Sequence, residues 1–103
     1  MTPRDGRRRG SDPSLLVLIS LAGGPRHGHA MQRDIFEFSD LELGPGTLYG
    51  AIERLEDDGL IEPLPADDRR TPYRLTDAGA DYLGRRTREL ERLVGVARKR
   101  ATT

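Results

Sequence analysis

The sequence has no cysteine, no tryptophan and no long apolar run. The absence of cysteine excludes a disulfide framework and a thiolate metal site. The longest apolar stretch, Leu15 to Ala22, is interrupted by Ser20 and is shorter than the roughly 20 residues that a membrane-spanning helix needs. The arginine-rich start of the chain leads into no adequate apolar signal region. We therefore expect a soluble, cytoplasmic protein.

The chain also lacks net charge, because 17 basic residues balance 17 acidic residues. DNA-binding domains are usually basic, so this balance counts mildly against a nucleic-acid partner. The charges are unevenly placed, however. From Asp34 to Glu62 the single basic residue is Arg54, whereas nine acidic residues occupy positions 34, 37, 40, 42, 53, 56, 57, 58 and 62. Any DNA-binding surface must be built from the ends of the chain and must avoid most of this acidic middle.

With 103 residues, the chain is expected to form one domain with a thin core that a partner often completes. Residues 1–10 hold four arginines and almost no apolar residue, so they are predicted to be a disordered basic arm. Such an arm either contacts the minor groove or phosphates of DNA or is a flexible, solubilising tail. The sequence leaves both interpretations open.

Start and stop signals predict the first two helices. Asp12 and Pro13 begin the first helix, and Gly23 to Pro25 end it. The second helix is predicted to run from about Gly28 to Phe38. Its apolar residues are spaced to form one buried face, made of Met31, Ile35 and Phe38.

A third helix and a hairpin follow. Thr47 is predicted to cap the helix, which runs to about Asp58 with Gly59 just beyond its end. Its apolar stripe consists of Leu48, Ile52 and Leu55. Residues 60–64 and 73–75 are predicted to pair as a small hairpin, with a turn at 67–70. Prolines at 63, 65 and 72 allow only short, edge-like pairing.

Thr76 is predicted to cap a last helix whose apolar residues recur every three or four positions. This spacing is typical of a coiled-coil seam, which so small a domain cannot bury by itself. We therefore expect the seam to pair with a second copy, together with the apolar first helix. The expected dimer-interface residues are Leu15, Leu18, Ala80, Leu83, Leu90, Val94 and Ala97.

The order of helix, helix, helix, hairpin and helix predicts a mainly α fold of the winged helix-turn-helix type. Residues 11–75 would form the DNA-binding domain and residues 76–100 a dimerisation helix. The stretch GPGTLYGAIERLEDDGLIE at 44–62 would supply the recognition helix, because its glycines let the backbone approach DNA and its early hydroxyls suit phosphate. An ordinary amphipathic helix would also account for this pattern.

Three segments resemble the PadR family of bacterial transcriptional regulators: LAGGPRHGHAM at 21–31, LGPGTLYGAIERLEDDGLIE at 43–62 and YRLTDAGADYL at 73–83. The resemblance covers about residues 13–95, and the single C-terminal helix is similar to the short branch of the family. It implies a homodimer that binds operator DNA through the third helix and the wing, usually as a repressor. The residues that match the recognition helix and basic wing are Gly46, Thr47, Tyr49, Gly50, Arg69, Arg70 and Arg74.

The chain departs from the family pattern at a few positions. His29 replaces a residue that is often aromatic, and Glu53 stands where relatives are often basic or polar. An acid at 53 should lie off the DNA backbone or accept from a cytosine amino group. Asp67 and Asp68 weaken the positive field of the wing.

Other functions find less support in the sequence. His27 and His29 lack further histidine or cysteine partners, so we expect no metal site and no cofactor. No motif indicates an enzyme. The main alternative is a winged-helix module that binds proteins rather than DNA, which would suit the acidic middle. The sequence shows no aromatic-lined pocket and leaves a small-molecule effector unassigned.

Overall fold

The computed structural model describes residues 12–102, so the predicted basic arm at 1–10 lies outside the described residues. Helix α1 spans Pro13–Ala22, with Pro13 in its first turn and the Asp12 side chain accepting from the Ser14 N–H at 3.0 Å. This start confirms the predicted capping. Helix α2 spans Gly28–Ser39 and ends at Asp40, whose φ of 67° is left-handed.

Helix α3 spans Pro45–Asp57 and begins three residues earlier than predicted. Gly44 is extended and precedes the helix without a side-chain cap, so the prediction that Thr47 caps α3 is wrong. Pro45 explains the difference, because its ring fixes φ at a helical value and it needs no donor at the first position. Gly59 has a φ of 75° and closes the helix as expected.

The sheet has three short antiparallel strands in the order β1-β3-β2. Strands β2 (Ile61–Pro63) and β3 (Pro72–Leu75) form the predicted hairpin. Strand β1 (Arg26–His27) was not predicted, because two residues carry no periodic signal. It pairs with the other edge of β3 and places His27 opposite Pro72. The wing base is therefore joined to the segment that starts α2.

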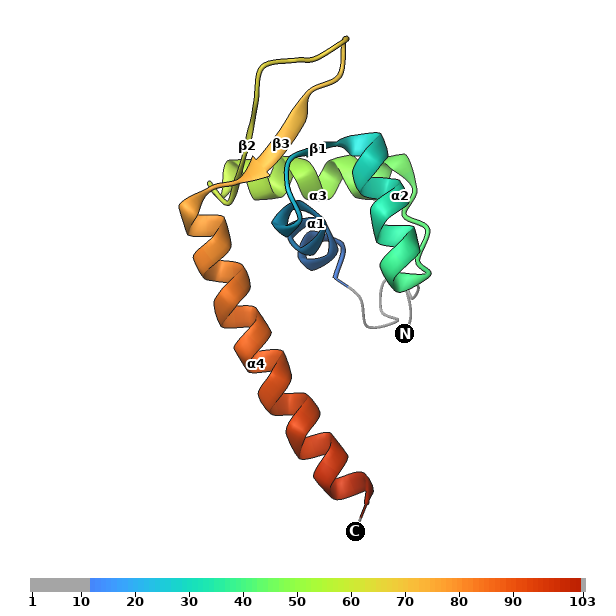
Figure 1. Ribbon diagram of the computed structural model, residues 1–103, viewed down its shortest axis with the longest axis vertical. Helices are drawn as coiled ribbons and strands as arrows, with labels where there is room; N and C mark the ends of the chain where they lie inside the picture. Colours follow the sequence, from blue (N-terminus) through green and yellow to red (C-terminus); the bar gives the residue numbers. More distant parts are fainter. Residues whose placement is uncertain (1–11, 103) are drawn as a thin grey trace.

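Helix α1 lies at the centre of the fold and contacts α2, α3, α4 and β3 (Figure 1). The buried core consists of Leu16, Val17, Leu18, Leu21, Met31, Ile35, Leu48, Ala51, Ile52, Leu55 and Ile61. The predicted buried face of α2 is correct for Met31 and Ile35 but wrong for Phe38, which is 44% exposed. Phe38 lies in the last turn of α2 and does not belong to the buried core.

A polar cluster around a buried hydroxyl explains the serine inside the apolar run of α1. Ser20 is 2% exposed and donates to Asp34 Oδ2 at 2.7 Å. The partly exposed Arg26 donates through Nε to the Ser20 carbonyl oxygen at 3.2 Å and lies 3.6 Å from Asp34 Oδ2. Because these residues come from α1, β1 and α2, the cluster ties the middle of α2 to α1 and β1.

Helix α4 spans Asp77–Ala101 and begins with the predicted Thr76 cap, which accepts from the Gly79 N–H at 3.0 Å. The Thr76 hydroxyl also donates to the Gly59 carbonyl oxygen at 2.7 Å. The first turns pack on the domain, and the rest of the helix runs away from it, on the side opposite the wing (Figure 1). Residues 91–102 are all exposed.

The architecture confirms the predicted class, a mainly helical winged helix-turn-helix followed by a long C-terminal helix. None of the helices within residues 12–102 is both long and apolar enough to cross a membrane.

Candidate nucleic-acid interface

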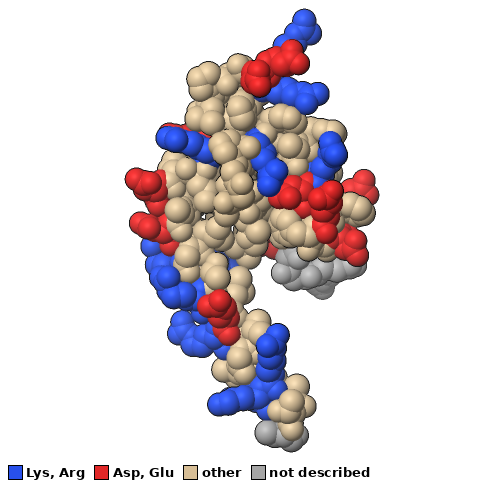
Figure 2. Space-filling model, viewed as in Figure 1, with Lys and Arg blue, Asp and Glu red and all other residues tan. Residues whose placement is uncertain are grey.

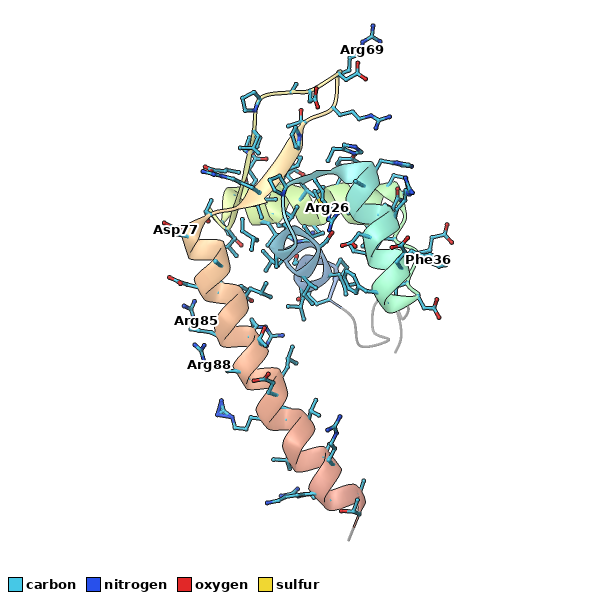
Figure 3. The ribbon with its side chains drawn as sticks, in the orientation of Figure 1. Arg26, Phe36, Arg69, Asp77, Arg85 and Arg88 are labelled. Carbon is cyan, nitrogen blue, oxygen red and sulfur yellow. The ribbon has the colours of Figure 1, made fainter. Side chains whose placement is uncertain are left out.

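The wing ends in a tight two-residue turn. Asp67 and Arg70 exchange two backbone hydrogen bonds, of 2.7 and 3.0 Å. Asp68 and Arg69 between them have φ values of 55° and 69°. Positive φ at both central residues defines the hairpin turn that matches the natural twist of paired strands. This geometry places Arg69 at the outermost point of the wing (Figure 3).

A hollow of about 350 Å³ separates the wing from the first turns of α2 and α3. Its lining residues come from β1, α2, α3 and the wing, and they are His27, His29, Tyr49, Arg69, Arg70, Thr71 and Tyr73. None of these carries a carboxylate, and all of them can donate a hydrogen bond in at least one protonation state. The hollow is thus suited to an anion, within a chain whose net charge is zero.

Tyr49 forms the floor between the two helices. It is 51% exposed, yet its hydroxyl lies so close to α2 that a Cβ built on Gly28 would be only 2.2 Å from Tyr49 Oη. Gly28 is therefore required for this packing. Burial raises the pKa of the nearby Tyr73 hydroxyl above its ordinary value, and Glu56 and Tyr49 raise it further. Tyr73 stays a neutral donor at ordinary pH.

His27 links the start of α2 to the wing and was not predicted to be a site residue. Its Nδ1 accepts from the Ala30 N–H at 3.2 Å and caps α2. Its Nε2 lies 3.2 Å from Nη1 of Arg70. The sequence offered only a faint signal for this role, a histidine immediately before a glycine that starts a helix.

The outer face of α3 is a row formed by Gly46, Gly50, Glu53 and Asp57, which lie opposite the buried stripe at helical spacing. A Cβ on Gly50 would meet only Arg54 Nη1, at 3.6 Å, and one on Gly46 would meet nothing within 4 Å. Thr47 is exposed beside this row. The predicted helix residues therefore share an accessible surface, with the acidic Glu53 near its middle.

Arg74 is not grouped with the other wing arginines. It alternates with Tyr73 along β3 and so points to the opposite face of the hairpin. There it pairs across the strands with Glu62, with 2.6 Å from Arg74 Nη2 to Glu62 Oε2. The structure thus brings Tyr49, Arg69 and Arg70 together and leaves Arg74 neutralised elsewhere.

In the view of Figure 2, acidic side chains gather over α2 and the segment after it, and basic side chains follow α4. At the wing tip acidic and basic side chains lie next to one another, because Asp67 and Asp68 are exposed beside Arg69. On α4, Arg85 and Arg88 project from the side that faces away from α1 (Figure 3). The acidic residues at 34–62 therefore lie mostly away from the wing tip.

The expected dimer-interface residues have different environments. Leu18 is fully buried in its own core, so it leaves no surface for a partner. Leu15, Leu83 and Leu90 are partly buried, whereas Ala80, Val94 and Ala97 are exposed. The seam pattern missed further exposed apolar side chains, namely Ile19 at 39%, Leu93 at 60% and Val96 at 43%. Within residues 12–102, no three histidine, cysteine or carboxylate side chains converge as a metal site would require.

Comparison with known proteins agrees with this geometry. Residues 15–85 match the transcriptional regulator PadR-like family. A transcriptional regulator from Clostridium thermocellum has a similar structure, with a TM-score of 0.77 and 28% identity over 96% of this chain and 97% of that chain.

Two curated proteins are also similar. An uncharacterized 37.1 kDa protein in transposon TN4556 of Streptomyces fradiae is 45% identical over 87 residues, which are 84% of this chain and 25% of that protein. Transcriptional activator GvpE2 of Halobacterium salinarum is 36% identical over 69 residues, which are 67% of this chain and 35% of that protein. The chain thus spans about a quarter to a third of the length of these relatives. The fold and the family match together show that this chain belongs to the PadR-like family of transcriptional regulators.

Proposed function

We propose that this regulator binds specific sequences of double-stranded DNA as a homodimer in the cytoplasm, and that its role is binding rather than catalysis. The observation that carries the proposal is the carboxylate-free hollow of Tyr49, Arg69 and Arg70 beside the open glycine row of α3. Guanidinium groups at a wing tip suit phosphate oxygens. Glycines on the exposed face of a helix let its backbone come close to the bases of the major groove.

Specificity would come from the first turns of α3. Thr47 offers a hydroxyl, and the glycines at 46 and 50 allow close approach. Glu53 lies one turn further along the same exposed row, where a carboxylate repels phosphate but accepts from the amino group of cytosine. We expect Glu53 to select bases in this way, while the wing supplies contacts that are independent of sequence.

The two copies of the homodimer would contact each other through α4. The C-terminal half of α4 carries Leu90, Leu93, Val94 and Ala97 along one side, beyond the reach of its own domain. A C2 partner presents the same surface in return. Two such helices pairing side by side, with Ile19 and Leu15 of α1 flanking them, would cover these apolar residues and set the spacing between the two wings.

The direction of regulation depends on where the operator lies. The family resemblance favours repression, which we adopt as the proposed outcome when the operator overlaps a promoter. The relative GvpE2 is named a transcriptional activator, so repression is not the role of every relative.

The test is a selection of genomic fragments bound by the purified protein, followed by titration of a selected duplex and a mixed-sequence duplex. Each titration is performed at two salt concentrations, because release of counterions makes affinity for DNA fall steeply with salt. We expect tighter binding to the selected duplex and a steep salt dependence on both. Absence of binding to either duplex would favour the alternative, a winged-helix module that binds proteins.

A further inference from the structure

We propose that the hollow between the wing and the start of α2 binds one phosphate of the DNA backbone, and that His27 donates to this phosphate while it caps α2. This inference rests on the DNA binding proposed above and adds a residue that neither the sequence pattern nor the family match assigns. It follows from the contacts of the two ring nitrogens.

Both nitrogens of His27 face N–H groups. Nδ1 is 3.2 Å from the Ala30 N–H nitrogen, and Nε2 is 3.2 Å from Nη1 of Arg70. A guanidinium can only donate, and a neutral imidazole has one acceptor nitrogen. The ring can therefore accept from Ala30 or from Arg70, but never from both. In the free protein, one of the two donors faces a ring nitrogen without forming a hydrogen bond.

An anion in the hollow removes this conflict. If the ring proton is on Nε2, Nδ1 stays free to cap α2, and Nε2–H and Arg70 both donate to the same phosphate oxygen or to neighbouring ones. A charged acceptor makes each of these bonds stronger than a bond between neutral groups. No charge has to change on His27, so the site needs no proton from solution.

The surroundings of the ring favour a phosphate over other ligands. Tyr49, Tyr73 and Thr71 line the same hollow and add hydroxyl groups. The N-terminus of α2, which His27 caps, adds the positive end of a helix dipole. The hollow is also lined by Arg69 of the wing tip and by Tyr49 of α3, which is next to Gly50 in the sequence. A duplex that contacts α3 and the wing would bring its backbone past this point.

The experiment compares His27→Asn with the wild-type protein on a mixed-sequence duplex, because a phosphate contact does not depend on sequence. Asparagine is a good helix cap, so His27→Asn should keep the thermal stability of the protein. It lacks a donor that reaches the position of Nε2, so we expect roughly tenfold weaker binding.

The salt dependence separates His27 from a simple charge contact. His27 would act as a neutral donor, so His27→Asn should leave the slope of log affinity against log salt unchanged. Arg70→Ala should weaken binding and reduce that slope, because a cation is lost. A reduced slope in His27→Asn would overturn the proposed neutral role.

The tautomer of His27 gives a direct readout. Nitrogen NMR of the ring should show the proton on Nε2 in the DNA complex, with a change in the ring signals when DNA is added. A ring that keeps its free-state spectrum on DNA would refute the assignment. If the wild-type protein binds no duplex, the proposed function itself fails. If it binds and His27→Asn binds equally well, only the phosphate site fails.

Discussion

Two helical glycines illustrate how single residues acquire different roles. A glycine inside a helix costs roughly 1 kcal/mol relative to alanine, so each one needs a compensating reason. A Cβ on Gly79 would lie 1.9 Å from the Leu60 carbonyl oxygen, which belongs to the backbone. A Cβ on Gly50 would meet only the end of the Arg54 side chain, at 3.6 Å. Packing within the chain explains Gly79 but not Gly50.

Gly50→Ala should therefore keep the melting temperature or raise it, with a gain of up to about 1 kcal/mol in the free energy of unfolding. The added methyl group would hold α3 away from the bases, so the affinity for a selected operator should fall. Calorimetry and an operator titration on the same variant measure both quantities. A stable Gly50→Ala protein with unchanged affinity would remove this face of α3 from the DNA interface.

At the scale of elements, the arginines of the wing have two different environments. Arg70 belongs to the turn before β3 and lies in the hollow against His27, whereas Arg74 lies within β3 and is paired across the strands with Glu62. The sequence groups them by proximity, but only the folded hairpin places a carboxylate opposite Arg74. Of the two, Arg70 is thus the one that we expect to contact phosphate.

Arg70→Ala should weaken binding to every duplex and flatten the salt dependence, because a phosphate contact is lost. Arg74→Ala is the matched variant and should leave affinity nearly unchanged. Its effect on stability should also be small, since an exposed ion pair contributes about 0 to 1 kcal/mol. Equal losses of affinity in the two variants would contradict the different roles of Arg70 and Arg74.

The contact between the start of α4 and the residue before β2 can also be tested. Gly79→Ala should destabilise the protein by about 1 to 3 kcal/mol or more, because the methyl group would collide with the Leu60 backbone. Gly95→Ala is the control, since a Cβ there meets nothing within 4 Å, and it should be neutral or stabilising. Denaturant unfolding of both variants measures the difference; equal stability would show that the start of α4 is loosely packed.

At the scale of the whole molecule, the domain and α4 extend in different directions. The chain measures 54 × 31 × 24 Å along its principal axes, and the long dimension comes from a helix of 25 residues, or about 37 Å. Leu93, Val94 and Val96 are each more than 40% exposed on the part of α4 that extends beyond its own domain. Exposed apolar side chains on a part of the helix that its own domain does not cover favour the dimer proposed above.

Leu93→Asp should convert the proposed dimer into a folded monomer, because a charge in an apolar interface is costly while the same side chain is exposed in a single chain. Sedimentation should show the mass falling from twice the 11.5 kDa of the chain to a single copy, with unchanged helical content in the domain. Arg92→Asp is the control on the opposite side of α4 and should remain dimeric. A wild-type protein that is a stable monomer at micromolar concentration would refute the proposed dimer.

The sequence by itself determined the order of the elements and most of their limits. Start and stop signals are local, because a cap such as Asp12 or Thr76 acts on backbone groups two or three residues away. Apolar spacing is also local, and it correctly identified the buried residues of α3. It was wrong for Phe38, which was expected to be buried and is exposed, and for Leu18, which was expected at an interface and is buried in its own core. The same apolar spacing occurs in a helix face that packs on its own core and in a face that packs on another chain.

Only the tertiary structure decided which residues meet across the fold. The strand β1, the contact of His27 with Arg70 and the packing of Tyr49 on Gly28 join segments that are far apart in the sequence. Their positions depend on how α1, α2 and α3 pack, and this packing cannot be predicted from a local sequence pattern. The hollow beside the wing arises from the same packing, because its donors come from four separate parts of the chain and face one another only after the core has formed.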